Sequence, residues 1–355
     1  MEKQRVSIFR QKNKKGLTVL SIVLCLVLSP ALSAMMFLPN TLTMMPVVLL
    51  LLLGYVGPVS ALGCTAALIA ASGFAFGVWG LLCMALLLVP VVLVSAFAVE
   101  REEPFWQSVA AGGVTMFAAL FGAVSILSLL AGSDFVSAIT HAVNQAFEMS
   151  GALGDTMLSM MVQMGVMSAP EGVDVGAMTA LDPQTREQML TSIVMMMDSV
   201  LRLEIPMRMA TGAVAAGLLG QAALRKGLRS HGNKVEYPRL RTWRIPSGWG
   251  RILGGTLVIL YLLAMLVPSS MNTMFYVFSG VFDQLFAIQG ITALCYLIYK
   301  KDKPALWQRV VFVAGYFFFG SFAMLIGIAD QAVDFTHRRE ELDKIENPFD
   351  PRRSE

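Results

Sequence analysis

Three polar side chains interrupt an apolar stretch near the C-terminus, and their chemistry suits solute binding. Asp283, Gln284 and Gln289 lie within residues 272–299. An Asp at the centre of a membrane helix costs about 2.5–3.5 kcal/mol, and such residues usually face a bundle interior or a water-filled cavity. We therefore expect these residues to line a cavity that binds a small-molecule ligand. In the alternative, the span starts later and Asp283 lies near the outer interface.

The sequence offers no recognisable arrangement for catalysis. It contains no phosphate-binding Gly-Lys-Ser/Thr loop, no His-Glu-x-x-His and no Gly-x-Ser-x-Gly. Its three histidines are far apart, and its four cysteines all lie in apolar stretches without metal-ligand spacing. We predict that the protein is not an enzyme, with no catalytic residue, no metal site and no cofactor.

The elements that position these residues must be membrane helices. Residues 16–99 form 84 consecutive positions without Asp, Glu, Lys or Arg, and the whole chain is 56% hydrophobic and 14% charged. Soluble domains carry about 25% charged residues, and one membrane helix needs about 20 apolar residues. The chain is therefore predicted to be an all-α, polytopic membrane bundle in a lipid bilayer. No region resembles a nucleic-acid-binding domain.

The apolar segments predict nine transmembrane helices. Each ends at a breaker such as Gly57-Pro58, the glycines between 77 and 80, or the charged cluster before Pro104. The first segment is interpreted as an uncleaved helix, although a cleaved signal peptide is an alternative. The predicted spans cover residues 17–37, 44–60, 61–77, 79–99, 107–131, 207–224, 252–268, 272–299 and 307–329.

Charge predicts the orientation of these spans. Six bases lie in residues 1–15, and eight bases against one acid lie in residues 225–251. Both clusters are expected on the cytoplasmic side, which requires an even number of crossings between them. The spans 17–37, 107–131 and 207–224 supply three crossings. Residues 44–99 must therefore supply an odd number, and three helices is the odd number that fits. The N-terminus is then cytoplasmic. Residues 132–200, with eight acids and one base, are external.

The C-terminal end admits two topologies. With nine spans the tail lies outside, although it contains Arg338, Arg339 and Lys344. With eight spans, one apolar stretch near the C-terminus is re-entrant or interfacial. The predicted division is an N-terminal membrane bundle at 1–131, an external segment at 132–204, a C-terminal membrane bundle at 205–335 and a charged tail at 336–355.

The external segment between spans five and six is rich in methionine. Thirteen of the 24 methionines lie between Met149 and Met209, and apolar positions recur at helical spacing. Methionine is flexible and common on adaptable binding surfaces. We expect amphipathic helices at the outer interface, or alternatively a methionine-lined cap over a ligand cavity or partner site.

Small residues and a basic loop suggest packing surfaces. Gly212, Ala216 and Gly220 recur every four positions, which lets helix backbones approach closely. Internal packing and docking onto a partner membrane protein both fit this pattern. Arg239, Arg241 and Arg244 lie in residues 225–246, which we call the basic loop, and could present charge to a partner at the membrane interface.

The C-terminal third resembles a known family. The motifs are a basic loop that leads to Trp243–Pro246, then Gln289-Gly290, a turn at 300–304, and Gly327–Asp330 followed by Arg338-Arg339. They resemble the YybS-like family of bacterial multi-pass membrane proteins, a domain of unknown function, with the best correspondence over residues 205–340. The resemblance implies a helical bundle in the bacterial cytoplasmic membrane. The family is distantly grouped with substrate-binding subunits of energy-coupling-factor transporters, which implies a separate energising module.

Two functions follow as hypotheses. In the first, the protein binds or transports a small solute, and a separate partner supplies the energy. In the second, it is a non-catalytic scaffold or regulator that contacts another membrane protein through its glycine stripes and basic loop.

Overall fold

The computed structural model describes residues 8, 15–34, 39–164, 183–301 and 305–333, and every regular element among them is helical. The predicted all-α membrane bundle is thereby confirmed as a fold class. The predicted C-terminal tail lies outside the described residues. The elements are α1 (Lys15–Ala34), α2 (Pro39–Tyr55), α3 (Pro58–Glu100), α4 (Phe105–Ala131), α5 (Phe135–Met149), α6 (Gly151–Gln163), α7 (Pro183–Ser230), the 3-10 helix η4 (Leu240–Thr242), α8 (Ser247–Leu266), α9 (Pro268–Lys300), α10 (Ala305–Phe318) and α11 (Gly320–Val333).

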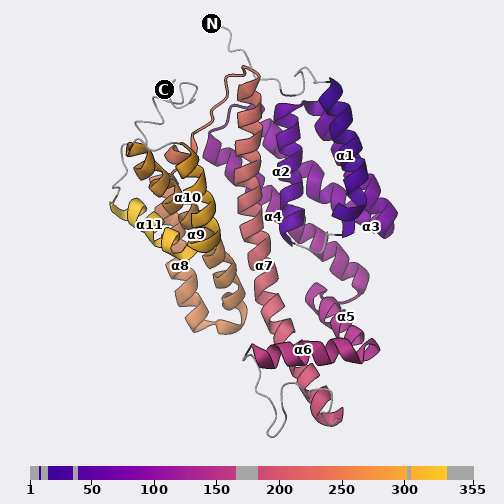
Figure 1. Ribbon diagram of the computed structural model, residues 1–355. Helices are drawn as coiled ribbons and strands as arrows, with labels where there is room; N and C mark the ends of the chain where they lie inside the picture. Colours follow the sequence, from indigo (N-terminus) through magenta and orange to yellow (C-terminus); the bar gives the residue numbers. More distant parts are fainter. Residues whose placement is uncertain (1–7, 9–14, 35–38, 165–182, 302–304, 334–355) are drawn as a thin grey trace. The chain divides into compact units, whose positions relative to one another are not determined.

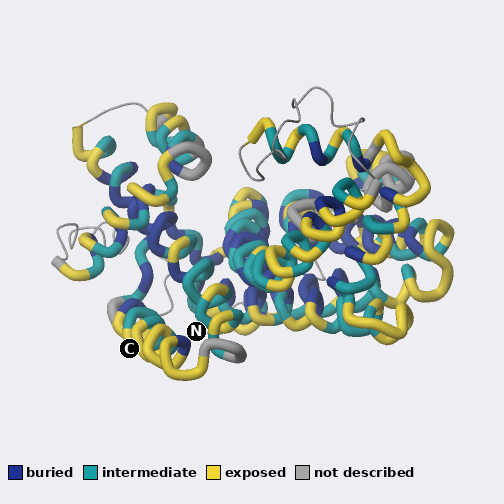
Figure 2. The backbone as a smooth tube through the Cα atoms, turned by 90° about the horizontal axis from the view of Figure 1, so that it is seen from below, coloured by how far each residue is buried: buried dark blue, intermediate teal, exposed yellow. Residues whose placement is uncertain are grey.

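The chain divides into two compact units. The first, which we call the membrane unit, comprises residues 1–123 and 207–355, and the second, the methionine-rich unit, comprises residues 124–206. In the membrane unit, α1 and α2 pack on α3, while α8, α10 and α11 pack on α9 (Figure 1). Buried, half-buried and exposed residues are interspersed within these helices (Figure 2).

Four helices of the described residues are long and apolar enough to cross a membrane. They cover Pro58–Glu100, Phe105–Ala131, Gly248–Leu266 and Met271–Lys300. Shorter apolar helical stretches cover Gly16–Cys25 and Thr43–Tyr55. Each of these long and short stretches overlaps a span expected from the sequence.

The helix α3 contains a chain reversal at Gly77. This residue has φ 68° and ψ −160°, a backbone conformation that only glycine adopts readily. The Ser72 hydroxyl donates to the carbonyl of Gly80 at 3.1 Å, across only eight residues. Two antiparallel arms therefore meet at Gly77, as expected for the boundary between the third and fourth predicted spans. The preceding boundary lies at Gly57 and Pro58, between α2 and α3.

The apolar half of α7 is packed mainly against protein. Gly212 lies against Thr43 of α2, where an added Cβ would come 2.6 Å from the Thr43 Cγ2, and Gly220 lies equally close to Leu50. Ala216, between them, is 2% exposed. This stripe holds α7 against α2, because glycine and alanine allow the two helices to approach closely.

The last predicted span, 307–329, is broken in the structure. Phe319 separates α10 from α11, and each helix has 14 residues, or about 21 Å at the α-helical rise. A hydrocarbon core of about 30 Å exceeds that length. Both helices also contact the same short stretch of α9: Gly315 faces Ile291, and Gly327 faces Phe286. This geometry favours the re-entrant, eight-span alternative, and the number of spans stays a prediction.

The methionine-rich unit has its own core. Phe147, Leu158 and Ile193 are its most buried members, and Met157, Met161, Met189 and Met197 pack with them. Other methionines are exposed, notably Met149 at 89% and Met164 at 68%. The amphipathic helices expected here correspond to α5, α6 and the first part of α7.

Candidate functional site

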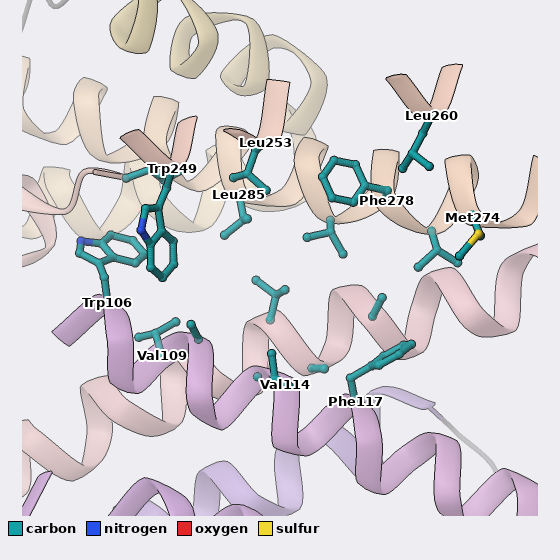
Figure 3. A pocket seen from close by; sticks show the side chains of 18 of the residues that line it. Trp106, Val109, Val114, Phe117, Trp249, Leu253, Leu260, Met274, Phe278 and Leu285 are labelled. Atoms are coloured by element: carbon teal, nitrogen blue, oxygen red, sulfur yellow. The ribbon is translucent and has the colours of Figure 1, made fainter. Parts of the chain in front are cut away.

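A large apolar cavity lies within the membrane unit. It has a volume of about 760 Å³, which is within the usual range for small-molecule sites. Its walls come from α4, α7, α8, α9 and the loop before α8 (Figure 3). Thr273 is the one lining residue with a hydroxyl, and nearly all the others have aliphatic or aromatic side chains. We call this space the apolar cavity.

The shape of the cavity follows the helices. The lining residues of α4 extend from Trp106 to Phe121, a length of about 22 Å at the α-helical rise. On α9 they include Met274, Phe278 and Leu285, at spacings of four and seven residues that place them on one face. The cavity is therefore elongated along the helices.

Two tryptophans lie together at one end of the cavity. Trp106 belongs to the first turn of α4 and Trp249 to the first turn of α8, and Figure 3 shows their indoles side by side. Ile245, from the basic loop, lines the same site. Tryptophan is enriched at membrane interfaces because its ring is apolar while its N–H seeks a polar partner. This end of the cavity adjoins the basic loop, which includes Arg244.

The wall between α4 and α7 depends on glycine. An added Cβ on Gly217 would lie 2.6 Å from the Val109 carbonyl oxygen and 2.8 Å from the Gly113 nitrogen. The two backbones are thus in direct contact. Ala213 lies one turn away, 2% exposed, and lines the cavity.

A buried arginine joins the end of α7 to the start of α4. Arg225 is 1% exposed and donates through Nη2 to the Glu103 carbonyl oxygen at 2.7 Å and to the Ser108 hydroxyl at 2.6 Å. Its Nη1 lies 3.7 Å from Oε2 of Glu236. That carboxylate also accepts from the backbone N–H of Phe105 at 3.0 Å. This network closes the bundle beside the tryptophan end of the cavity.

A second buried network surrounds Gln289. This side chain is 2% exposed; its Oε1 accepts from the Ile245 N–H at 3.3 Å, and its Nε2 donates to Asp330 Oδ2 at 3.2 Å and Gln331 Oε1 at 2.8 Å. Thr292, one turn further along α9, donates to the Trp243 carbonyl oxygen at 2.8 Å. The network ties the basic loop and α11 to α9.

The structure separates the three polar residues expected to line a site. Gln289 lies in the buried network, Gln284 is half-buried, and Asp283 is exposed on α9. None of the three is among the residues that line the apolar cavity. Their contact with a ligand stays a prediction.

The basic loop residues also differ from one another. The Arg241 guanidinium carbon lies 3.6 Å from the centroid of the Tyr299 ring, a cation–π contact that attaches the loop to α9. Arg244 is half-buried, whereas Arg239 is exposed. Arg239 is thus the most accessible of these three for an interaction at the membrane surface.

The described residues contain no group of three or more His, Cys, Asp or Glu that could hold a metal ion. The four cysteines are free thiols. The residues that line the apolar cavity supply shape and hydrophobic surface.

The sequence did not single out the lining residues or Arg225. The lining residues are ordinary apolar side chains, and only the tryptophans near the start of two spans give a signal. Arg225 was grouped with the basic loop because Lys226 and Arg229 follow it. Its position four residues after Gln221, on the buried face of a helix, is the pattern that identifies it.

Residues 33–331 match the family described as Predicted membrane protein (DUF2232). The chain belongs to this family. The match covers most of the chain, including the larger part of both halves of the membrane unit, and confirms the resemblance to an uncharacterised family of membrane proteins. No curated protein and no solved structure matches the chain.

Proposed function

We propose that this DUF2232 protein is a non-enzymatic membrane protein that binds an amphiphilic small molecule with a long hydrocarbon chain. The apolar cavity is the observation that carries this proposal. Its elongated apolar walls match a hydrocarbon chain, because burial of apolar surface contributes about 25 cal/mol per Å².

The cavity also suggests how the ligand lies. The tail extends along α4 and α9, away from Trp106, and the polar group lies at the tryptophan end. Arg244 in the loop and Arg251 in α8 flank cavity-lining positions at this end, so an anionic group is favoured. A long-chain carboxylic acid is the simplest molecule with these properties.

We further propose that the protein takes part in transport of this ligand and that another protein supplies the energy. The sequence shows no nucleotide-binding loop, so any movement of the ligand would need a separate energising partner. The protein would then act as the membrane-embedded binding component, in a bacterial cytoplasmic membrane with its N-terminus in the cytoplasm.

Tryptophan fluorescence tests the proposal directly. The purified protein in detergent is titrated with 9,10-dibromostearic acid, since bromine quenches indoles in contact with it, and stearic acid serves as competitor. We expect saturable quenching that unbrominated stearic acid reverses. Quenching that rises linearly, without saturation or competition, would contradict a specific site.

A further inference from the structure

Asp283 lies in the part of α9 that is long and apolar enough to cross a membrane. The candidate span in α9 covers Met271–Lys300, and a crossing takes about 20 residues. Every stretch of that length within the candidate span contains Asp283. The residue is nevertheless exposed on the surface of the membrane unit.

Asp283 belongs to a polar face of α9. Asn272, Tyr276, Ser279 and Asp283 follow one another at spacings of four, three and four residues, which places them on one side of the helix. Asn272 and Asp283 are exposed, and Tyr276 is 47% exposed. We call these four residues the polar face of α9.

This polar face points away from the apolar cavity. At about 100° per residue, its direction is roughly opposite to that of the cavity-lining residues Met274, Phe278 and Leu285. Within the part of the chain that the structure describes, no hydrogen bond or ion pair reaches the Asp283 carboxylate. The ligand of the cavity therefore does not cover this face.

An exposed Asp in lipid is costly. The cost of inserting a carboxylate is highest at the centre of a membrane helix, and it falls when the carboxylate is paired. A second copy of this chain is a poor match, because a symmetric contact brings the same face of both copies together and sets one Asp283 against another. A basic side chain on a neighbouring helix offsets the cost through opposite charge.

We propose that the polar face of α9 docks a transmembrane helix of a different membrane protein, and that this helix carries a Lys or Arg opposite Asp283. Asn272, Tyr276 and Ser279 add hydrogen-bonding groups along the same contact, as polar residues do between membrane helices. The inference identifies a partner surface and is independent of ligand binding in the apolar cavity.

Photo-crosslinking in membranes of the native host tests the contact. Benzoylphenylalanine replaces Tyr276 in one variant and Val258 in a control variant. Val258 lies on α8, is 57% exposed and belongs neither to the polar face nor to the cavity lining. We expect an adduct with one other membrane protein from position 276 and none from position 258. An adduct only between two copies of this chain, or no adduct, would overturn the proposal.

Substitutions at Asp283 then test the charge. Asp283→Leu should lower the adduct yield at least tenfold, while stearic acid binding in the cavity is retained. Once mass spectrometry identifies the partner, Asp283→Arg combined with Asp in place of the partner's basic residue should restore the adduct. Asn has nearly the same shape as Asp, so the Asp283→Asn variant serves as the control for correct folding. An unchanged yield in Asp283→Leu, or a partner span without Lys or Arg, would refute the pairing.

Discussion

Arg225 donates through Nη2 to the hydroxyl of Ser108 at 2.6 Å, which fixes the end of α7 against the first turn of α4. The same helices form one wall of the apolar cavity. The position of the tryptophan end therefore depends on a buried charge that has no contact with the cavity itself.

Removing this charge should destabilise the protein strongly. Arg225→Leu removes the opposite charge that lies 3.7 Å from the buried Glu236 carboxylate, and breaking a buried ion pair costs about 3–5 kcal/mol. We expect a clearly lower melting temperature in detergent, with Arg225→Lys falling between Arg225→Leu and the native protein. The double variant Arg225→Leu, Glu236→Leu should be more stable than Arg225→Leu alone. If all variants have the same melting temperature as the native protein, the network has no structural role.

The contact between α9 and α11 gives a second prediction. An added Cβ on Gly290 would overlap the backbone carbonyl of Ala323, so Gly290→Ala should force α11 away from α9. Gly254 has open space around its Cβ position, and Gly254→Ala should leave stability unchanged or raise it by up to about 1 kcal/mol. Hydrogen exchange of α11 measures the difference. Equal protection in both variants would show that α11 does not pack on Gly290.

The methionine-rich unit should respond to acid through Asp134. Although slight burial raises the pKa of this exposed carboxyl, hydrogen bonds from the Ser137 N–H and the Arg202 guanidinium outweigh it and hold the pKa below its usual value. The folded state then gains stability above the unfolded pKa of about 3.9 and loses it as the pH falls through the lowered folded value.

The first turn of α5 reports this effect. Its amide hydrogen exchange should accelerate as the pH drops below about 4, beyond the intrinsic change in exchange rate, because Asp134 is the N-cap. In Asp134→Asn the extra acceleration should disappear. An identical pH profile in the variant would exclude Asp134 as the source.

The sequence predicted much of this fold, for physical reasons. Long uncharged stretches require membrane helices, and Gly57, Pro58 and Gly77 mark breaks because proline lacks an N–H and glycine accepts positive φ. The break at Phe319 was not predicted, although Gly320 follows it directly, because single glycines are also common within membrane spans. Both α10 and α11 pack on α9, and this packing depends on contacts distant in sequence.

The site was less predictable than the fold. Polarity identified Gln289 and Asp283 as unusual, but the faces they occupy depend on which helices surround α9. Gln289 is enclosed by the basic loop and α11, six residues from an Asp283 that is exposed. The apolar cavity leaves no pattern in a sequence where nearly every span is apolar.

Binding by cavity-filled variants tests the central claim most directly. Val277 lines the apolar cavity, whereas Val258 is exposed on α8 outside it, so Val277→Phe and Val258→Phe add the same atoms at sites inside and outside the cavity. We measure the Kd for 9,10-dibromostearic acid by tryptophan quenching. We expect Val277→Phe to raise the Kd about tenfold, equivalent to about 1.4 kcal/mol, and Val258→Phe to leave it unchanged. Equal Kd values for both variants and the native protein would contradict ligand binding in this cavity.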